Sequence, residues 1–583
     1  MIFMNKNVLF AILGINMVVL MILSHNYYQT QPTTRMTTVL DSDKSSLYRF
    51  DNPELAYKVL EQLDIFEVYS DPNLTDEEAA HEYSRPYLGL IIDDHYCEKH
   101  RAYFVNNAAS FFTQKNFMTN YRAKAIFRYE VIPKMGGRDV MPYVHSKMNE
   151  EFQNQFIYDL RHDLNMYFTS NSLCEYRIIG KHFSCLTQQS NHIPGHNHLY
   201  RKDYVARSLK EYGRKYETRP QCFNDMKFFP KTYIMLEEEH CREFFRVFNG
   251  EEYQKLKQER GLVYIRKIGA HAHQGAGVFP LNEKQEKYMR DTYQNGTLCG
   301  KVEENNLLQY AVWNPLLLNG RKFDFRMFMI VASTNPLMLY YRDGFLRVSL
   351  RDYDPTSKEK GAILTNIALS KPFFEMAKEN GTYNGYTEDE LLNQAFWTMP
   401  KLEKFLYETG VVKDPQWLDN YLRPEFKKAY IHLLRMSSGP FAKRSSLYEI
   451  YGLDFMLDEN LNLWFIEANA EPLLDGWSDD TKVFFNSILY DSFDIAFGLM
   501  RSRVKRIVNF VNYLIRDSQV WQTADNGVFI ENLAARRKEF REITKNYFEP
   551  EFLPSPSNKY SLIIDENLSG PGRYFGFLEP ECD

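Results

Sequence analysis

The chain has 583 residues, of which 44% are hydrophobic, and a formal net charge of -6. This length is enough for about two to four domains. So modest a charge argues against a dedicated nucleic-acid-binding protein. The seven cysteines are scattered, with no CxxC pair and no spacing typical of a metal site. This odd set indicates reduced thiols, although it leaves open a disulfide such as Cys174–Cys185.

An apolar stretch at residues 8–23 predicts a signal anchor or signal peptide within residues 1–30. A helix of this length spans about 24 Å, short of the ~30 Å hydrocarbon core of a membrane. No small-x-small cleavage site follows, which favours an uncleaved anchor over a cleaved signal or a dispensable helix. The flanking positive charges are nearly balanced and leave the orientation of this segment open.

Four Asn-x-Ser/Thr sequons begin at Asn73, Asn295, Asn380 and Asn567. They are glycosylation sites only if the surrounding loops are lumenal. In so asparagine-rich a chain, this number is near the one expected by chance.

Residues 31–170 combine a polar linker with a mixed region that has no catalytic spacing. Residues 28–47 are rich in Thr, Gln and Ser, which is typical of a linker. A helix is predicted from Pro53 to about Tyr69, because Asn52 is a good N-cap and proline is favoured at the first helical position.

The segment at residues 190–203 contains His192, His196 and His198. No acidic or thiol partner lies at helical spacing from them. We therefore interpret the segment as an irregular loop with exposed imidazoles rather than as a metal site.

Residues 261–281 are typical of a loop that folds over phosphates. A strand ends near Lys267, and the small residues around Ala276 lead into a second strand. Small residues let backbone N–H groups approach a phosphate, and the lysine supplies the countercharge.

The strand expected at residues 321–331 carries alternating charges. Lys322, Asp324 and Arg326 share one face, and Phe323 and Phe325 take the other. Two cations around an acid predict an anion- and ribose-binding surface, with a solvated edge strand as the alternative.

Polar residues continue downstream of this strand. Asp343 and Gly344 predict a hairpin turn, which Arg347 follows. Thr365 and Asn366 are expected in a later loop.

Two short strands joined by a polar turn form the motif richest in chemistry. With a four-residue loop at 459–462, Asp454 lies opposite Glu467 and Gly452 opposite Asn469. A one-residue slip would turn each side chain to the other face. Carboxylate and amide oxygens suit Mg²⁺, whereas an exposed hairpin with solvated acids is the alternative.

Strict alternation also places Leu463, Phe465, Glu467 and Asn469 on one face of the second strand. The two acids are therefore expected to face each other among apolar side chains. Such a pair is costly to bury unless a cation lies between its members.

Residues 501–583 predict a helical C-terminal extension. Its first helix carries Arg501, Arg503, Lys505 and Arg506. These residues form either a solvated face or a contact with an acidic protein tail or an anionic membrane surface.

The ordered motifs of this chain resemble those of the tubulin–tyrosine ligase-like family. They are NHIPG with a following RKD, FFPKTY, YIRK with a following GAG, QYAVWNPLLLNGRKFDFR, DGFLRVS, LTN and YGLDFMLDENLNLWFIEANAEP. The resemblance covers about residues 175–500 and implies a family domain at residues 171–500. It implies the ATP-grasp fold, an α/β (α+β) architecture in which a nucleotide lies between two mixed or antiparallel sheets with flanking helices.

The resemblance also implies roles for single residues. The Mg²⁺ ligands would be Asp454, Glu467 and Asn469. The catalytic arginines, which face the phosphates and the acceptor carboxylate, would be Arg326 and Arg347. The positions that contact ATP would be Lys267, Gln309, Lys322, Asp324, Thr365 and Asn366.

The implied activity is an ATP- and Mg²⁺-dependent ligase that joins tyrosine, glutamate or glycine to a protein carboxylate through an acyl phosphate. Its partners would be a free amino acid and tubulin or another acidic protein tail, with no nucleic acid. Ala276, Tyr310 and Ile363 depart from residues common in the family. The alternative is therefore a membrane-tethered pseudoenzyme that keeps the fold and binds ATP or tubulin.

The expected location is a membrane, through a single N-terminal pass of unknown orientation. A cytoplasmic, microtubule-associated protein is the alternative. A lumenal catalytic domain would never meet microtubules and would need another carboxylate as its acceptor.

Overall fold

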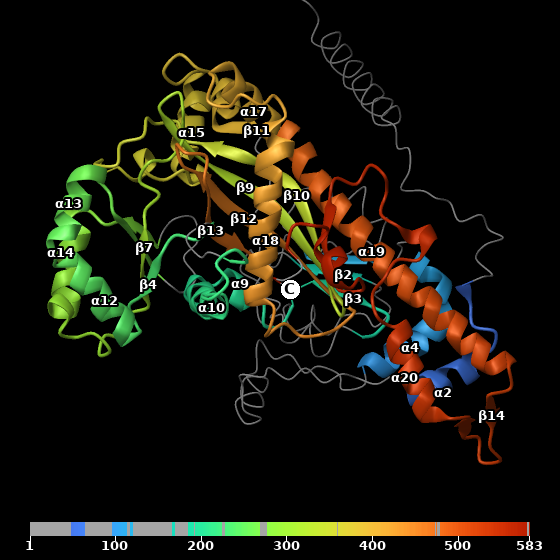
Figure 1. Cartoon of the computed structure of the whole chain (residues 1–583). Coiled ribbons are helices and arrows are strands. Elements are labelled where there is room, and N and C mark those ends of the chain that lie inside the picture. Colours follow the sequence, from blue (N-terminus) through green and yellow to red (C-terminus); the bar gives the residue numbers. More distant parts are fainter. Residues whose placement is uncertain are drawn as a thin grey trace, which may run out of the picture. The chain divides into compact units, whose positions relative to one another are not determined.

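A mixed sheet of ten strands forms the larger part of the fold (Figure 1). Its main path runs β1-β2-β3-β12-β9-β10-β11, with β13 paired to β12, β16 to β10 and β8 to β9. The strands are β1 (Phe117–Asn120), β2 (Met166–Thr169), β3 (Gln189–Asn191), β8 (Leu317–Leu318), β9 (Arg321–Thr334), β10 (Leu337–Val348), β11 (Phe396–Thr398), β12 (Leu447–Leu457), β13 (Leu463–Asn469) and β16 (Ser561–Asp565).

A second sheet has four antiparallel strands in the order β4-β7-β5-β6. They are β4 (Thr232–Ile234), β5 (Tyr264–Ile268), β6 (Val278–Pro280) and β7 (Asn306–Tyr310). Three helices pack with this sheet around its own aromatic core, namely α12 (Glu238–Phe248), α13 (Glu251–Arg260) and α14 (Glu283–Tyr293). Two sheets with separate cores are consistent with the expected α/β architecture.

The computed structural model describes residues 48–63, 96–112, 117–120, 166–169 and 185–579, together with residue 582. Within the last range, it leaves out 192, 224–227, 269–276, 358, 471, 473 and 475–478. The expected membrane segment, the expected linker up to residue 47 and the expected phosphate loop around Ala276 lie outside the described residues.

The remaining helices flank the sheets or lie near the chain ends. Helix α2 begins at Pro53, as predicted, and the backbone amide of Leu55 donates to Asn52 Oδ1 at 3.1 Å. Other helices are α4 (Tyr96–Asn107), α9 (Asn197–Tyr200), α10 (Lys202–Lys215), α15 (Lys371–Asn380), α16 (Glu388–Ala395), α17 (Met399–Glu408), α18 (Arg423–Ser437), α19 (Asp479–Arg516) and α20 (Leu533–Ile543). A separate hairpin pairs β14 (Val520–Gln522) with β15 (Val528–Ile530).

Alternation along β9 separates the main core from the polar residues, as predicted. On one face, Phe325 packs edge to face against Phe426 of α18, with ring centroids 5.3 Å apart. On the other face, Phe328 lies 6.4 Å from Phe484 of α19. Because side chains on a strand alternate, the even-numbered residues at the start of β9 lie on the α19 side of the sheet.

Helix α19 runs without a break through residue 500, and its basic residues make contacts within the protein. Arg503 is fully buried and donates to the carbonyl oxygens of Leu186, Gln188 and Ser445. Lys505 pairs with Glu549, at 2.9 Å, and with another glutamate. The interpretation of this segment as a solvated basic face is therefore wrong.

Helix α19 is also the one stretch among the described residues that is long and apolar enough to cross a membrane. This judgement rests on length and composition alone. The candidate stretch is residues 481–516, and 61% of its most apolar 18 residues is buried inside the protein. Burial of this kind is equally typical of the core helix of a globular fold.

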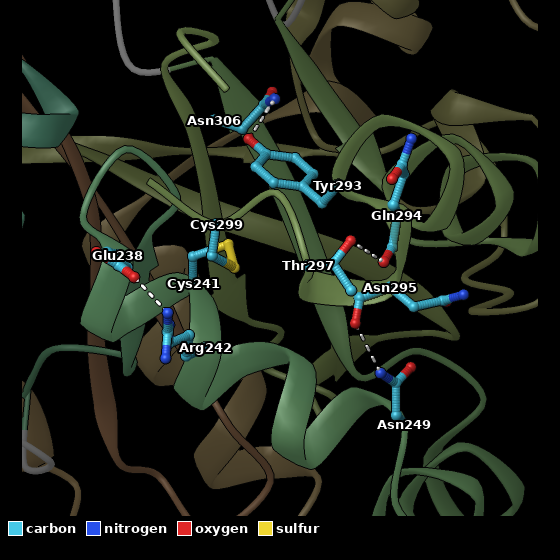
Figure 2. Close-up of a disulfide and its surroundings, with 10 residues drawn as sticks. All are labelled: Glu238, Cys241, Arg242, Asn249, Tyr293, Gln294, Asn295, Thr297, Cys299 and Asn306. Atoms are coloured by element: carbon cyan, nitrogen blue, oxygen red, sulfur yellow. Dashed lines mark hydrogen bonds and ion pairs between the residues drawn. A yellow bond between two sulfur atoms is a disulfide. The ribbon is translucent and has the colours of Figure 1, made fainter. Parts of the chain in front are cut away.

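Six cysteines form three disulfides, which contradicts the expectation of reduced thiols. The pairs are Cys97–Cys185, Cys222–Cys582 and Cys241–Cys299. Figure 2 shows the third pair, which joins α12 to the segment after α14. Cys185 is bonded to Cys97, so the pairing with Cys174 does not form. The bonded cysteines are 88, 360 and 58 residues apart and are brought together by tertiary structure. No short spacing motif in the sequence could therefore predict these bonds.

The Cys241–Cys299 disulfide should contribute measurably to stability. Replacing both residues by alanine should lower the free energy of unfolding by about 2–4 kcal/mol, because the bond restricts the unfolded chain. Denaturant titration of the wild-type protein and the double alanine variant, both in a buffer without reductant, measures the difference. The difference should vanish when both proteins are fully reduced, and equal stability without reductant would contradict the expectation.

Candidate functional site

The β12–β13 hairpin places Asp454 directly opposite Glu467, and Gly452 opposite Asn469. The predicted pairing is confirmed, but the predicted four-residue loop is wrong. Leu457 pairs with Leu463, so the loop has five residues, and the register shifts by one between Phe455 and Asp454. A β-bulge at Ile466 supplies the extra residue that restores the pairing.

Strand β12 ends one residue earlier than predicted because Asp458 makes hydrogen bonds within the turn. The Asp458 carboxylate accepts hydrogen bonds from the backbone amides of Asn460 and Asn462, both at 2.9 Å. It also accepts from the indole of Trp464 at 3.1 Å. An aspartate that binds its own turn is a common way to close a tight loop.

The bulge also changes which side chains share a face. Paired residues of an antiparallel ladder lie on the same face, so Phe465 lies with Phe455 and Glu467 lies with Asp454. The two phenyl rings are 5.5 Å apart in the main core. The expectation that Phe465 and Glu467 share a face is therefore wrong, and the acids face the polar side of the sheet.

Asp454 is bound by two arginines from the two neighbouring strands, β9 and β10. Arg326 donates to both carboxylate oxygens at 2.6 and 3.1 Å. Arg347 lies 2.9 Å from Oδ2. Burial acts to raise the pKa of Asp454, but the two guanidinium groups outweigh it and hold the pKa below its usual value.

The network continues from Arg347 to the expected nucleotide-contacting residues. Arg347 also donates to both oxygens of Asp324, at 2.7 and 2.6 Å. Thr365 Oγ1 donates to Asp324 Oδ2 at 2.6 Å. The carbonyl oxygen of the next residue, Asn366, accepts the amide of Leu369 at 2.9 Å and begins a 3-10 turn. The structure therefore gathers Asp324, Thr365 and both arginines around Asp454.

Glu467 has lysine neighbours instead. Lys202 Nζ lies 3.2 Å from Glu467 Oε2. Lys267 Nζ donates to the carbonyl oxygen of the bulged Ile466 at 3.3 Å. Burial lowers the pKa of Lys267 to about 8, although the negative charge of Glu467 acts to raise it. Lys202 was missed as a site residue, although it lies in the RKD part of the first motif and starts helix α10.

The donor set of Asp454, Glu467 and Asn469 fits Mg²⁺, since it consists of two carboxylates and one amide. The amide nitrogen of Asn469 is buried and has no hydrogen-bond partner, so this side chain is not committed to another contact through that atom. Within the described part of the chain, no group of three or more His, Cys, Asp or Glu is arranged to hold a metal ion. A metal here would therefore depend on the Asn469 amide and on oxygen atoms of a ligand.

Lys322 is a buried ammonium group without a carboxylate at salt-bridge distance among the described residues. Its side chain is almost fully buried, and its Nζ lies 5.3 Å from the centroid of the Tyr353 ring. Burial lowers the pKa of Lys322 to about 8, although the nearby charge of Asp324 acts to raise it. A buried cation of this kind is stabilised by an incoming anion.

Gln309 lies on β7, across a small cavity from β13. Its amide nitrogen donates to Thr232 Oγ1 at 3.0 Å. The cavity has a volume of about 40 Å³ and is lined in part by Lys202, Lys267, Gln309 and Glu467.

Strand β10 continues through Asp343 and Gly344, where a hairpin turn was predicted. The register shifts between Arg342 and Phe345 instead, which marks a bulge. A Cβ atom on Gly344 would lie 1.7 Å from the carbonyl oxygen of Arg326. Only glycine allows this approach of the two backbones, and the bulge leaves Arg347 paired with Asp324.

His196 differs from its expectation as an exposed imidazole. It is buried, and its Nδ1 lies 3.2 Å from Glu449 Oε2. Ile363, one of the departures from the family pattern, is also buried. Both residues are part of the packing around the site rather than of its solvent-facing surface.

Comparison with known proteins extends the resemblance seen in the motifs. The model of the tubulin-tyrosine ligase family matches residues 181–504. The chain is 26% identical over 304 residues to the inactive polyglycylase TTLL10 of Homo sapiens, covering 49% of this chain and 41% of that protein. It is 24% identical over 326 residues to the protein polyglycylase TTLL10 of Mus musculus, covering 52% and 42%.

A third relative is the probable tubulin polyglutamylase ttll-9 of Caenorhabditis elegans. It is 27% identical over 307 residues, which is 52% of this chain and 66% of that protein. The chain thus spans less than half the length of the two polyglycylase relatives and slightly less than two thirds of the worm protein.

Binding of a phosphate ligand should weaken with rising pH. Below pH about 8 the Lys322 ammonium is charged, and above it the free protein loses that charge. The dissociation constant of a triphosphate probe should rise at least about tenfold between pH 7 and 9, because linkage to one such group gives tenfold and Lys267, with a pKa also lowered to about 8, adds to it. Calorimetric titration tests this. The Lys322→Arg variant, which stays charged, should show a smaller rise, and an equal rise in both proteins would exclude Lys322 as the cause.

Gly344→Ala should separate β9 from β10 at the site. The added Cβ meets backbone rather than a flexible side chain, so the cost should be about 1–3 kcal/mol or more. Thermal unfolding measures it. Gly439→Ala is the matched control, because nothing lies within 4 Å of a Cβ at that position. Equal melting temperatures for the two variants would show that the close approach is unimportant.

Proposed function

Because the chain belongs to the tubulin-tyrosine ligase family, we propose that it is an ATP- and Mg²⁺-dependent ligase that joins an amino acid to a protein carboxylate. The observation that carries this proposal is the charge of the site. Three carboxylates (Asp324, Asp454 and Glu467) are surrounded by five cations, namely Lys202, Lys267, Lys322, Arg326 and Arg347. The excess of positive charge suits ligands that are themselves strongly anionic.

The proposed reaction activates a poor electrophile. An oxygen of the acceptor carboxylate attacks the γ-phosphorus of ATP, the bond from phosphorus to the bridging oxygen breaks, and ADP leaves. The amine nitrogen of the incoming amino acid then attacks the carbonyl carbon of the acyl phosphate and loses a proton. Inorganic phosphate leaves, and a peptide or isopeptide bond remains.

The cations of the site act by lowering the repulsion between two anions. Lys267 and Lys322 are proposed to bind the phosphates of ATP. Arg326 and Arg347 are proposed to present guanidinium donors to the phosphates and to the acceptor carboxylate, a geometry that favours two hydrogen bonds per anion. Mg²⁺, held by Asp454, Glu467 and Asn469, would supply further positive charge to the phosphates.

The remaining site residues position the nucleotide. We assign Gln309 and its strand to the adenine, and Asp324 to the ribose and phosphates. Thr365 fixes the Asp324 carboxylate through its hydroxyl, and Asn366 stands in the same loop. No side-chain nucleophile is needed, since the acceptor carboxylate itself attacks the phosphorus.

The names of the relatives support glycine or glutamate among the amino acids added and a protein as the acceptor. Two are polyglycylases and one is a probable tubulin polyglutamylase, so tubulin is the first acceptor to test. One of them is described as inactive. That observation favours, as a second candidate, a pseudoenzyme that binds ATP or tubulin without turnover.

Incorporation of radiolabelled tyrosine, glutamate or glycine into tubulin separates the two candidates. Glu467→Gln should reduce incorporation by at least ~100-fold, because it removes one charge from the proposed metal ligands. Glu408→Gln is the control, since Glu408 lies on α17 and its side chain is 62% exposed. Wild-type protein that binds ATP but incorporates no amino acid into tubulin or into the acidic secretory proteins of a cell extract would leave only the pseudoenzyme.

A further inference from the structure

The three disulfides carry information about the compartment in which this chain folds. Cys241 and Cys299 are 0% and 5% exposed, and Cys222 and Cys582 are 5% and 2% exposed. These two bonds are enclosed within the fold, whereas the Cys97–Cys185 bond joins a half-buried Cys97 to a buried Cys185. Disulfides of this kind persist in secretory and extracellular compartments, whereas the cytosol keeps thiols reduced.

The sequon at Asn295 lies beside one of these disulfides. Figure 2 shows it on the turn that leads from Tyr293 to Cys299, with the amide nitrogen of Asn295 directed away from the other residues drawn. Asn295 is exposed, and its Oδ1 accepts from Arg290 at 3.3 Å. None of the described residues accepts a hydrogen bond from its amide nitrogen. The required third residue, Thr297, is exposed as well.

The sequon at Asn380 is equally open. Asn380 is the last residue of α15, and Asn380, Gly381 and Thr382 are all exposed. A Cβ atom built on Gly381 would have no neighbour within 4 Å. A large polar group attached here would therefore extend into solvent without displacing any packed side chain.

The sequon at Asn567 differs in its contacts. The amide nitrogen of Asn567 donates to the carbonyl oxygen of Asn546 at 3.0 Å and to Asp565 Oδ1 at 2.9 Å. Both amide hydrogens are thus in use, and a substituent on this nitrogen would remove one of the two bonds. Asn567 is therefore a matched control for Asn295 and Asn380, because the fold does not leave its amide nitrogen available to carry a glycan.

We propose that this chain folds in an oxidising, extracytosolic compartment and carries N-linked glycans at Asn295 and Asn380 but not at Asn567. The apolar stretch at residues 8–23 is of the type that directs a chain into that compartment. The exposure of two sequons and the formation of three disulfides, two of them fully enclosed, are independent observations, and both point to the same side of a membrane.

Two covalent steps are implied. The amide nitrogen attacks the anomeric carbon of a lipid-diphosphate-linked oligosaccharide. The N–C bond forms, the C–O bond to the diphosphate breaks, the lipid diphosphate leaves and the amide loses one proton. Each cysteine pair transfers two electrons and two protons to the disulfide of a thiol oxidoreductase, which becomes a dithiol.

One consequence rests on the proposed ligase function. The site and the glycosylated turns belong to the same compact unit, residues 50–583. The acceptor carboxylate would then belong to an acidic protein of that compartment, because cytosolic microtubules are on the other side of the membrane.

The glycan test uses the full chain expressed in cultured animal cells. All variants carry Asn73→Gln, which removes the sequon outside the described residues. Peptide-N-glycosidase F should increase the electrophoretic mobility of the parent protein. Asn295→Gln and Asn380→Gln should each remove one step of that shift, and the double variant should remove it all. Thr297→Ser, which keeps the sequon and its hydroxyl, should leave the shift unchanged.

Asn567→Gln is the matched control and should not alter the shift. A parent protein without any shift would overturn the proposal, and loss of a step in Asn567→Gln would overturn the assignment of sites from amide contacts. Neither readout depends on catalysis. A glycosylated chain without ligase activity would therefore overturn the proposed function alone.

The redox test counts thiols on the same purified protein. A maleimide mass tag applied after denaturation without reductant should label one of the seven cysteines, because six are paired. Labelling after reduction should reach all seven. Seven labels before reduction would show a chain that folds in a reducing compartment and would overturn the proposal.

Discussion

The site depends on one buried carboxylate, Asp454, held between two guanidinium groups from separate strands. A charge in the interior costs several kcal/mol unless it is paired, so Asp454, Arg326 and Arg347 are each tolerated only because of the others. The contacts join β12 to β9 and β10 at one level of the sheet. The same network fixes Asp324 through Arg347. Any ligand of this site therefore meets side chains whose positions are already determined by mutual charge.

Two irregularities in otherwise regular strands make that network possible. The bulge at Ile466 turns Glu467 and Asn469 to the side of Asp454 while Phe465 stays in the core. The bulge at Asp343 and Gly344 adjusts β10 against β9, so that Arg347 pairs with Asp324. Bulges next to functional sites are common because an extra residue re-aims side chains without ending the strand pairing.

The three lysines of the site belong to different elements. Lys202 begins α10, Lys267 lies on β5 of the second sheet, and Lys322 lies on β9. Their charges would be costly without anions nearby, and burial lowers the pKa of both Lys267 and Lys322. The cavity between β7 and β13 is lined in part by Lys202, Lys267 and Glu467. A nucleotide bound there would supply the missing negative charge.

The sequence by itself determined the local features whose cause lies within a few residues. Alternation predicted the charged face of β9, and the N-cap and proline predicted the start of α2. Alternation with an assumed four-residue loop predicted the pairing of Asp454 with Glu467, which a five-residue loop and a bulge produce instead. Each depends on strand or helix periodicity or on short-range turn chemistry. These features include most of the residues that the structure gathers around Asp454.

Only the tertiary structure decided which charges meet and which cysteines bond. Lys202 reaches Glu467 across 265 positions of sequence, and Cys222 reaches Cys582 across 360. The bulge at Ile466 depends on how Asp458 closes its turn, and the burial of His196 and Arg503 depends on elements far along the chain. Local periodicity carries no information about such contacts, because they are set by the packing of whole elements against one another.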